Sequence, residues 1–256
     1  MAKLLTKGLA ETFDHEAIGL GAVALMAGAA ALFAEVADDQ AEPDGRASDW
    51  RVLKALRRNG DPKDPVGPKW LQRAAEETTA LGGLTVVGGA TALASGGLWL
   101  AGRRREAAWV AATFVGGLAL SEGLKRVYTR GRPPREYRVA AAESHSFPSG
   151  HALLSAVTYL TIGAVVARSL SDARLKVYAL AAGVGAATAT GVTRVYLGVH
   201  WANDVVGGWA GGLFWAASSW MATKAWTTTA LGRPHRHPAA WRRSWPRLAG
   251  ISRLRA

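Results

Sequence analysis

The chain has 256 residues and carries 31 Lys and Arg against 19 Asp and Glu, a net charge of +12 with the histidines neutral. This balance favours an anionic partner, which by composition alone could be nucleic acid, a membrane surface or a phosphorylated substrate. The absence of cysteine excludes disulfides, thiolate catalysis and cysteine-ligated zinc. The 11 tryptophans fit a protein that meets membrane interfaces, where an indole ring has one apolar and one wet side.

Six apolar runs recur along the chain, and most approach the roughly 20 residues that a helix needs to cross a hydrocarbon core. They lie at 17–36, 80–102, 107–124, 152–168, 177–197 and 205–223. We therefore predict an all-α, polytopic membrane bundle of six transmembrane helices. The run at 107–124 is the weakest, since Glu122 lies in its last turn, and a buried helix is the alternative there. In the last run, two overlapping small-xxx-small patterns predict close packing against a neighbouring helix. They are built from Gly207, Gly208, Gly211 and Gly212.

The first run has two interpretations. Lysines precede it, as they do in a cleaved signal peptide, but Asp14 and Glu16 stand directly before the apolar core, where a signal peptide would be positive. A retained span is therefore favoured. The predicted domains are a membrane domain over 1–226, with a motif-bearing core at about 107–223, and a basic tail over 227–256.

The short loops give the predicted orientation. The loops 103–106 and 168–176 are net positive, and the tail after Lys224 contains no acidic residue. By the positive-inside rule, both termini are expected to be cytoplasmic. The tail interleaves Arg with Trp, so we expect it to be disordered and to meet anionic lipid head groups, not nucleic acid.

The segment 38–78 separates the first two runs. Its apolar residues recur at three-residue spacing from Trp50, which predicts a short helix that Ser48 or Asp49 caps and Gly60 ends. An amphipathic helix on the outer membrane face and a plain solvated loop both remain open for this segment.

Polar residues stand at the ends of the last four runs. Lys125 and Arg132 follow the third run, Ser149, Gly150 and His151 open the fourth, and Arg194, His200 and Asp204 lie between the fifth and the sixth. If successive spans run antiparallel, all three groups fall on the same membrane face, whichever way the protein is oriented.

The residue types at these ends fit anion chemistry. Arg194 interrupts an apolar stretch, and an arginine there usually needs an anion. The start of a helix at Ser149 offers free N–H groups and a positive dipole end to an anion, although a simple N-cap is the alternative. His200 and Asp204 are four residues apart, so on a helix the carboxylate can fix the imidazole tautomer and leave the other nitrogen as nucleophile or base.

Three stretches resemble the signature motifs of the type 2 phosphatidic acid phosphatase superfamily, which includes integral-membrane lipid phosphate phosphatases and soluble vanadium haloperoxidases. They are KRVYTRGRP at 125–133, PSGH at 148–151 and TRVYLGVHWAND at 193–204. The one departure is Thr193, where the third motif usually has serine, and threonine keeps the hydroxyl. The segment 38–78 and the tail lie outside the motifs.

The resemblance implies a mechanism. His200 is implied to be the nucleophile that forms a phosphohistidine, Asp204 orients it, and His151 is the general acid and base. The residues implied to bind the phosphoryl oxygens are Lys125, Arg132, Ser149, Gly150 and Arg194. The implied activity is metal-independent, without a cofactor, and removes the terminal phosphate of a lipid such as phosphatidic acid, phosphatidylglycerol phosphate or undecaprenyl diphosphate. Together with the predicted orientation, this implies a bacterial inner membrane protein with its site on the periplasmic face.

Three alternatives stay open at this point. A vanadate-dependent haloperoxidase would use the same pocket, and a lipid-binding or transport protein could keep the fold without catalysis. His151, His200 and Asp204 could also form a metal site, but three nearby cations would repel a divalent ion. The oligomeric state is not predicted, and His145 and Ser146 acquire no role.

Overall fold

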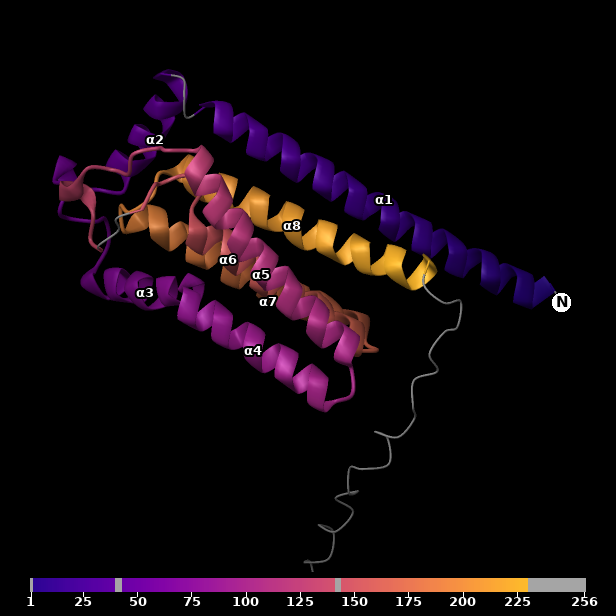
Figure 1. Ribbon diagram of the computed structural model, residues 1–256. Coiled ribbons are helices and arrows are strands. Elements are labelled where there is room, and N and C mark those ends of the chain that lie inside the picture. Colours follow the sequence, from indigo (N-terminus) through magenta and orange to yellow (C-terminus); the bar gives the residue numbers. More distant parts are fainter. Residues whose placement is uncertain (1, 40–42, 141–143, 230–256) are drawn as a thin grey trace, which may run out of the picture. The chain divides into compact units, whose positions relative to one another are not determined.

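The computed structural model describes residues 2–39, 43–140 and 144–229, with side chains over 19–39, 46–140 and 144–223. Within these ranges the secondary-structure elements are all helices (Figure 1), which confirms the all-α class. The long helices are α1 (Ala2–Asp39), α4 (Leu84–Leu100), α5 (Arg104–Val127), α6 (Gly150–Ser169), α7 (Ala173–Tyr196) and α8 (Ala202–Thr229). The shorter elements are α2 (Pro43–Ala55), α3 (Lys69–Thr79) and the 3-10 turns η1 (Arg58–Gly60), η2 (Ala80–Gly82) and η3 (Arg135–Tyr137). Of the predicted tail 227–256, all but the end of α8 lies outside the described residues.

Among the described residues, four helices are long and apolar enough to cross a membrane: the part of α1 from Gly19 to Asp39, and α5, α6 and α7. A fifth span results if α3, η2 and α4 count as one bent unit. α8 covers the sixth predicted run but is not among them, because glycine, tryptophan and serine lower its mean hydropathy. An integral membrane protein is therefore supported, whereas the count of six spans is confirmed only in part.

The second predicted run begins inside a bend. The helical segments before and after Gly83 are inclined by 51°. Gly82 lies at a tightly packed point of this bend, because a Cβ there would lie 2.4 Å from Cγ2 of Thr190 and 3.0 Å from Cβ of His151. The Tyr159 hydroxyl also donates a hydrogen bond to the Leu81 carbonyl at 2.6 Å. The bend therefore packs against α6 and α7 near the first turn of α6.

α6 is the most enclosed of the four candidate spans, with 61% of its apolar window buried against 22% to 28% in the others. α8 lies directly against it. A Cβ on Gly208 would come within 2.7 Å of the Ser149 carbonyl oxygen, and one on Gly212 within 2.6 Å of the Leu153 carbonyl oxygen. The predicted close packing of the last run is thus confirmed, and its partner is α6.

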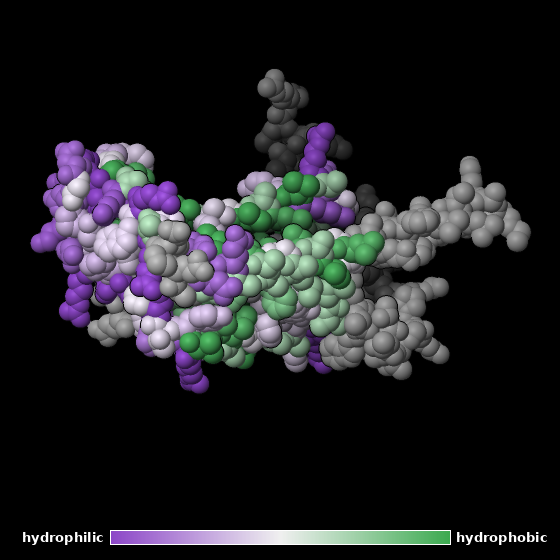
Figure 2. All heavy atoms as spheres, turned by 90° about the horizontal axis from the view of Figure 1, so that it is seen from above, coloured by the Kyte–Doolittle hydropathy of each residue, from purple (hydrophilic) through white to green (hydrophobic). Residues whose placement is uncertain are grey.

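One end of the bundle gathers the polar segments. α2, the start of α3 and the loop 128–140 lie at the left end of Figure 1. Figure 2 shows the same end as largely hydrophilic, whereas hydrophobic residues dominate the helices further along. The C-terminal ends of α5 and α7 and the N-terminal ends of α6 and α8 all reach this polar end.

The helix predicted within 38–78 exists, but its predicted start is wrong. α2 begins at Pro43, a residue that suits the first turn of a helix, so neither Ser48 nor Asp49 caps it. Asp49 instead lies inside α2 with 1% of its surface exposed. Gly60 ends the following turn η1 with a positive φ of 78°. Because Leu53 is also buried, α2 packs onto the polar end of the bundle and is not a solvated loop.

Candidate active site

The polar end brings the sequence-predicted site residues together on four helix ends. Lys125 lies in the last turn of α5, Gly150 and His151 in the first turn of α6, Arg194 in the last turn of α7 and Asp204 in the first turn of α8. Arg132, Ser149 and His200 lie in the connections beside these ends. Each residue is therefore carried by a helix end or a short connection that packs against the others.

His200 and Asp204 form a buried pair, with 2% and 0% of their surfaces exposed. Nδ1 of His200 lies 3.3 Å from Oδ2 of Asp204, and Nε2 lies 3.0 Å from Nη1 of Arg132. A guanidinium group can only donate, so Nε2 accepts that hydrogen bond and Nδ1 carries the proton that faces the carboxylate. The Nε2 lone pair therefore points toward the cations, as a nucleophile requires.

The Asp204 carboxylate is held from several sides. Besides His200, its Oδ2 accepts hydrogen bonds from the Ser146 hydroxyl and from the Trp201 backbone N–H, the latter at 2.9 Å. Its Oδ1 accepts from Nη1 of Arg130 at 2.8 Å. These donors fix the orientation of the carboxylate and, through it, of the imidazole ring.

Arg132 is fastened to the loops around it. Nε donates to the Ser144 carbonyl at 2.6 Å, and Nη1 donates to the Val199 carbonyl at 2.7 Å. Because these bonds fix the planar guanidinium, its position beside His200 is set before any substrate arrives.

Arg194 is buried, with 6% of its surface exposed. Nη1 donates to the Thr79 hydroxyl at 3.0 Å, but its Nε has no hydrogen-bond partner among the described residues. An unpartnered buried N–H costs free energy, so this geometry favours a site that is completed by an anion.

The N-terminus of α6 carries the next polar groups. Ser149 occupies the N-cap position, yet its side chain makes no capping hydrogen bond, and its buried Oγ has no partner within the described part of the chain. A Cβ on Gly150 would lie 3.2 Å from Nζ of Lys125 and 3.4 Å from Oγ of Ser121. An ammonium group and two hydroxyls thus surround a helix start whose N–H groups attract anions, and the simple N-cap interpretation does not hold.

His151 lies in the same turn and is half-buried. Lys125, Arg132, Arg194 and His200 are all near enough to act electrostatically on its ring. The ring therefore belongs to the same cluster as the predicted nucleophile.

Burial dominates the electrostatics of the connecting loops. It lowers the pKa of His200 to about 4, although Asp204 opposes this effect and Arg132 adds to it. Burial also lowers the pKa of Arg132, against the charge of Asp204. His200 is consequently neutral at physiological pH, in agreement with its hydrogen bonds.

Three residues of this network were not predicted as site residues. Ser146 was expected to have no role, but its hydroxyl contacts Asp204. Arg130 lies two residues before Arg132 in the first motif, so its place in the motif was a signal that could have found it. Asp49 had no such signal, because nothing in the sequence ties α2 to α8. His145, by contrast, is an exposed residue.

The described part of the chain contains no group of three or more His, Asp or Glu that could hold a metal ion. A ligand set of His151, His200 and Asp204 is thus not among the groups found there.

An apolar groove lies between several of the helices. It has a volume of about 1060 Å³ and is lined by residues of α2, α3, α7 and α8. Thr78 and Thr193 belong to its walls, and they directly precede Thr79 and Arg194. The groove therefore runs past the chain segments that carry Thr79 and Arg194.

Known proteins match this chain in sequence and in fold. The family model described as PAP2 superfamily matches residues 106–228. Over 73 residues the chain is 41% identical to phosphatidylglycerophosphatase B of Bacillus subtilis (strain 168), a match that spans 27% of this chain and only 35% of that protein. The fold matches the crystal structure of a transmembrane PAP2 type phosphatidylglycerolphosphate phosphatase from Bacillus subtilis with a TM-score of 0.71 and 22% identity. That match covers 78% of this chain and 96% of the other.

Proposed function

Because residues 106–228 match the PAP2 superfamily model, we propose that the chain is a PAP2-type membrane lipid phosphatase that removes the terminal phosphate of a lipid phosphate or diphosphate. The observation that carries the proposal is the buried His200 side chain. Its Nδ1 faces Asp204, and its Nε2 lone pair faces the guanidinium of Arg132. A nucleophile directed at a cluster of cations suits the attack on a phosphoryl group.

In the first step, Nε2 of His200 attacks phosphorus. A P–N bond forms, the P–O bond to the lipid breaks, and His151 gives its proton to the leaving oxygen. Asp204 stabilises the positive charge that develops on the imidazole ring, since its carboxylate already accepts a hydrogen bond from the Nδ1–H group.

In the second step, water attacks the phosphohistidine. His151, now neutral, takes a proton from that water, a new P–O bond forms, and the P–N bond breaks to release inorganic phosphate. The enzyme returns to its starting state, so no external acid, base or reductant is consumed.

The cations and hydroxyls stabilise the negative charge on the oxygens of the transferred phosphoryl group. Phosphoryl transfer asks a protein mainly for positioning and for charge stabilisation on the equatorial oxygens. We assign this role to Lys125, Arg132, Ser149, Gly150 and Arg194. The unpartnered Oγ of Ser149 and Nε of Arg194, among the described residues, support the assignment because each has a hydrogen bond to give. On this proposal three fixed cations take the place of a metal ion.

A lipid substrate is favoured over a soluble one. The cation cluster lies at one end of helices that are apolar enough to cross a membrane, and the walls of the apolar groove include Thr193, the residue before Arg194. A phosphate head group at this end and a hydrocarbon chain along the groove would satisfy both features. A haloperoxidase would need no apolar groove beside its anion site, and a purely lipid-binding protein would need no oriented histidine.

Phosphatidylglycerol phosphate is the first substrate to test, because both relatives are named for that activity. Phosphatidic acid and undecaprenyl diphosphate present a similar terminal phosphate. We further propose that the protein resides in a bacterial inner membrane, with cytoplasmic termini and its site on the periplasmic face, as a membrane domain over 1–226 with a basic tail.

The test is phosphate release by the purified full-length protein from these three lipids in mixed micelles, with and without a chelator. We expect turnover of at least one lipid, unchanged by the chelator, and none with the His200→Ala variant. Activity that a chelator abolishes and added metal restores would refute the metal-independent mechanism. Vanadate-dependent halide oxidation without phosphate release would favour the haloperoxidase alternative.

A further inference from the structure

We propose that Asp49, on α2, is a positioning residue for the nucleophile: through Arg130 it keeps one oxygen of Asp204 available to His200. The proposal rests on the proposed phosphatase function. Asp49 lies outside residues 106–228, to which the family model applies, so the family match does not assign it a role.

Arg130 bridges two buried carboxylates. Its Nη1 donates to Oδ1 of Asp204 at 2.8 Å, and its Nη2 donates to Oδ2 of Asp49 at 2.5 Å. The exposed fraction of the side chain is 10% for Arg130, 1% for Asp49 and 0% for Asp204. In this arrangement each carboxylate receives one of the two terminal nitrogens of the guanidinium.

This division matters for the second oxygen of Asp204. Arginine and a carboxylate prefer a bidentate pair in which two N–H groups meet two oxygens. A bidentate Arg130 would occupy Oδ2 of Asp204, the oxygen that faces Nδ1 of His200. Asp49 holds the other guanidinium nitrogen, so Arg130 makes only a single bond to Asp204 and leaves Oδ2 to the histidine.

Asp49 is itself held firmly in place. Its Oδ1 accepts a hydrogen bond from the backbone N–H of Asn203 at 3.0 Å, which joins α2 to the first turn of α8. Beside it, the rings of Trp50 and Trp201 meet edge to face with their centroids 5.1 Å apart. Burial raises the pKa of Asp49 against the lowering effect of Arg130, so its place in the network comes at a desolvation cost.

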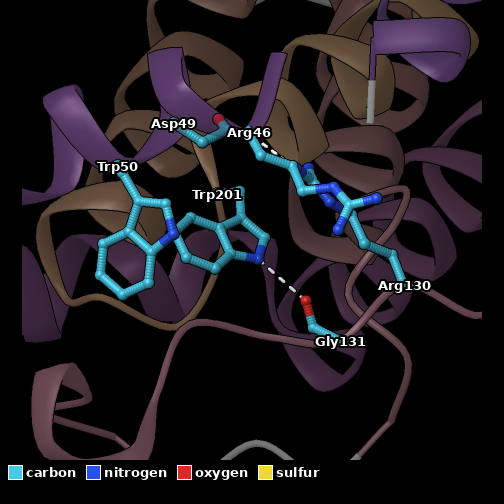
Figure 3. Close-up of a pocket in the computed structure, with 6 residues that line it drawn as sticks. All are labelled: Arg46, Asp49, Trp50, Arg130, Gly131 and Trp201. Atoms are coloured by element: carbon cyan, nitrogen blue, oxygen red, sulfur yellow. Dashed lines mark hydrogen bonds and ion pairs between the residues drawn. The ribbon is translucent and has the colours of Figure 1, made fainter. Parts of the chain in front are cut away.

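Figure 3 shows the surroundings of this network. Asp49 and Arg130 line a pocket of about 310 Å³ together with Trp50, Trp201 and Gly131, and the Trp201 indole donates to the Gly131 carbonyl at 2.8 Å. Gly131 and Arg130 belong to the first motif, whereas Trp201 lies beside His200. The pocket thus places α2 directly behind the loops that carry the phosphate-binding arginine and the nucleophile.

The test compares Asp49→Asn with Asp49→Glu in the purified full-length protein, using the lipid that the wild type hydrolyses. The asparagine keeps the shape and loses the charge that holds Arg130, whereas glutamate restores the charge. We expect kcat to fall roughly tenfold or more in Asp49→Asn, with KM within about twofold of wild type, and to recover in Asp49→Glu. The matched control is Asp64→Asn, which removes the carboxylate of an exposed pair with Arg58 in the same segment and leaves kcat unchanged.

A double-mutant cycle separates positioning from a general loss of structure. Asp49 acts only through Arg130, so Asp49→Asn is expected to have no further effect on kcat in an Arg130→Gln background. If Asp49→Asn does not fold, Arg130→Gln carries the test, with the same loss of kcat at unchanged KM.

The outcomes separate the two proposals. A wild type without turnover defeats the phosphatase proposal, and the Asp49 inference with it. An active wild type overturns the Asp49 inference alone under any of three results: Asp49→Asn keeps full kcat, it raises KM without changing kcat, or its effect adds in full to that of Arg130→Gln.

Discussion

At His200 the chemistry depends on which ring nitrogen keeps its lone pair. Nδ1 carries the proton that faces Asp204. Nε2 keeps its lone pair, because Arg132, which faces it, can only donate a hydrogen bond. Burial is the main reason that the imidazole is neutral, and the charges of Arg132 and Arg194 add to the effect, because a further positive charge beside them is unfavourable once water is excluded. On the proposed mechanism, the cations assigned to phosphate binding therefore also help to keep the nucleophile unprotonated.

The protonation state of His200 can be tested directly. Since burial lowers its pKa to about 4, the neutral ring is present above that value and is lost as the pH falls through it. In the ¹⁵N spectrum of histidine-labelled protein, assigned by loss of the signal in His200→Gln, we expect an unprotonated Nε2 at about pH 5.5, where an ordinary histidine is mostly charged. Titration near 6.5 would contradict the electrostatic picture.

Ser149 gives a second test at the residue scale. Its Oγ is buried and, among the described residues, unpartnered, so Ser149→Ala removes a donor for the phosphoryl group without breaking a helix cap. We expect kcat/KM to fall about tenfold or more, and the thermal midpoint not to fall. The control is Ser155→Ala in α6, whose hydroxyl donates to the Ala152 carbonyl and whose loss leaves kcat/KM unchanged. Equal losses in the two variants would contradict a phosphate-binding role for Ser149.

Sequence spacing predicted the groups that lie on helix ends and missed those that join distant segments. His200 and Asp204 are four residues apart, so their contact is local, although His200 lies two residues before the start of α8 and not, as was expected, on the helix itself. The Ser146 hydroxyl contacts Asp204 because the loop before α6 packs against the first turn of α8. Asp49 is linked to Asp204 through Arg130, which pairs with both carboxylates. Contacts of that kind depend on tertiary packing, which no local pattern encodes.

At the element scale, α8 shows how a sequence pattern becomes packing. Its small residues bring its backbone against α6, and the backbone N–H of Ser149 donates to the Asp204 carbonyl at 2.9 Å. This contact ties the motif at the start of α6 to the motif at the start of α8. α2 illustrates the opposite case: its periodicity predicted a helix, but Asp49 was expected to be a cap because a buried aspartate has no local signature.

The α6–α8 contact predicts a difference between two glycines. A Cβ at Gly212 would lie 2.6 Å from the Leu153 carbonyl oxygen, a backbone atom that cannot move aside cheaply. Gly212→Ala is therefore expected to destabilise the protein by about 1–3 kcal/mol, measured as a lower thermal midpoint in detergent. Gly96→Ala in α4, where no atom lies within 4 Å, is the control and leaves the midpoint unchanged or raises it. Equal midpoints in the two variants would be inconsistent with close α6–α8 packing.

At the scale of the whole molecule, the alternation of spans brings four helix ends to one polar end. The antiparallel order of the apolar runs was enough to predict that the three motifs share a membrane face. The bend of 51° between α3 and α4 was not predictable, because it depends on how η2 packs against His151 and Thr190. The count of six spans is confirmed only in part, since glycine, tryptophan and serine lower the mean hydropathy of α8.

The proposed orientation has a simple test, because the chain contains no cysteine. Lys63→Cys places a thiol at an exposed position of the segment at the polar end, and Arg105→Cys places one at the exposed start of α5. A membrane-impermeant maleimide on intact cells is expected to label the cysteine at position 63 and not the one at position 105, with both labelled after lysis. The reverse pattern would place the site on the cytoplasmic face.

Trapping the covalent intermediate is the most direct test of the mechanism. Protein mixed with a lipid substrate that carries ³²P in its terminal phosphate, and denatured at alkaline pH, is expected to retain label on His200, because a P–N bond survives alkali and is lost in acid. The label should be absent from His200→Ala and should disappear from wild type as inorganic phosphate is released. Turnover of the same substrate at full rate by His200→Ala, or label on a different residue, would contradict a phosphohistidine at His200.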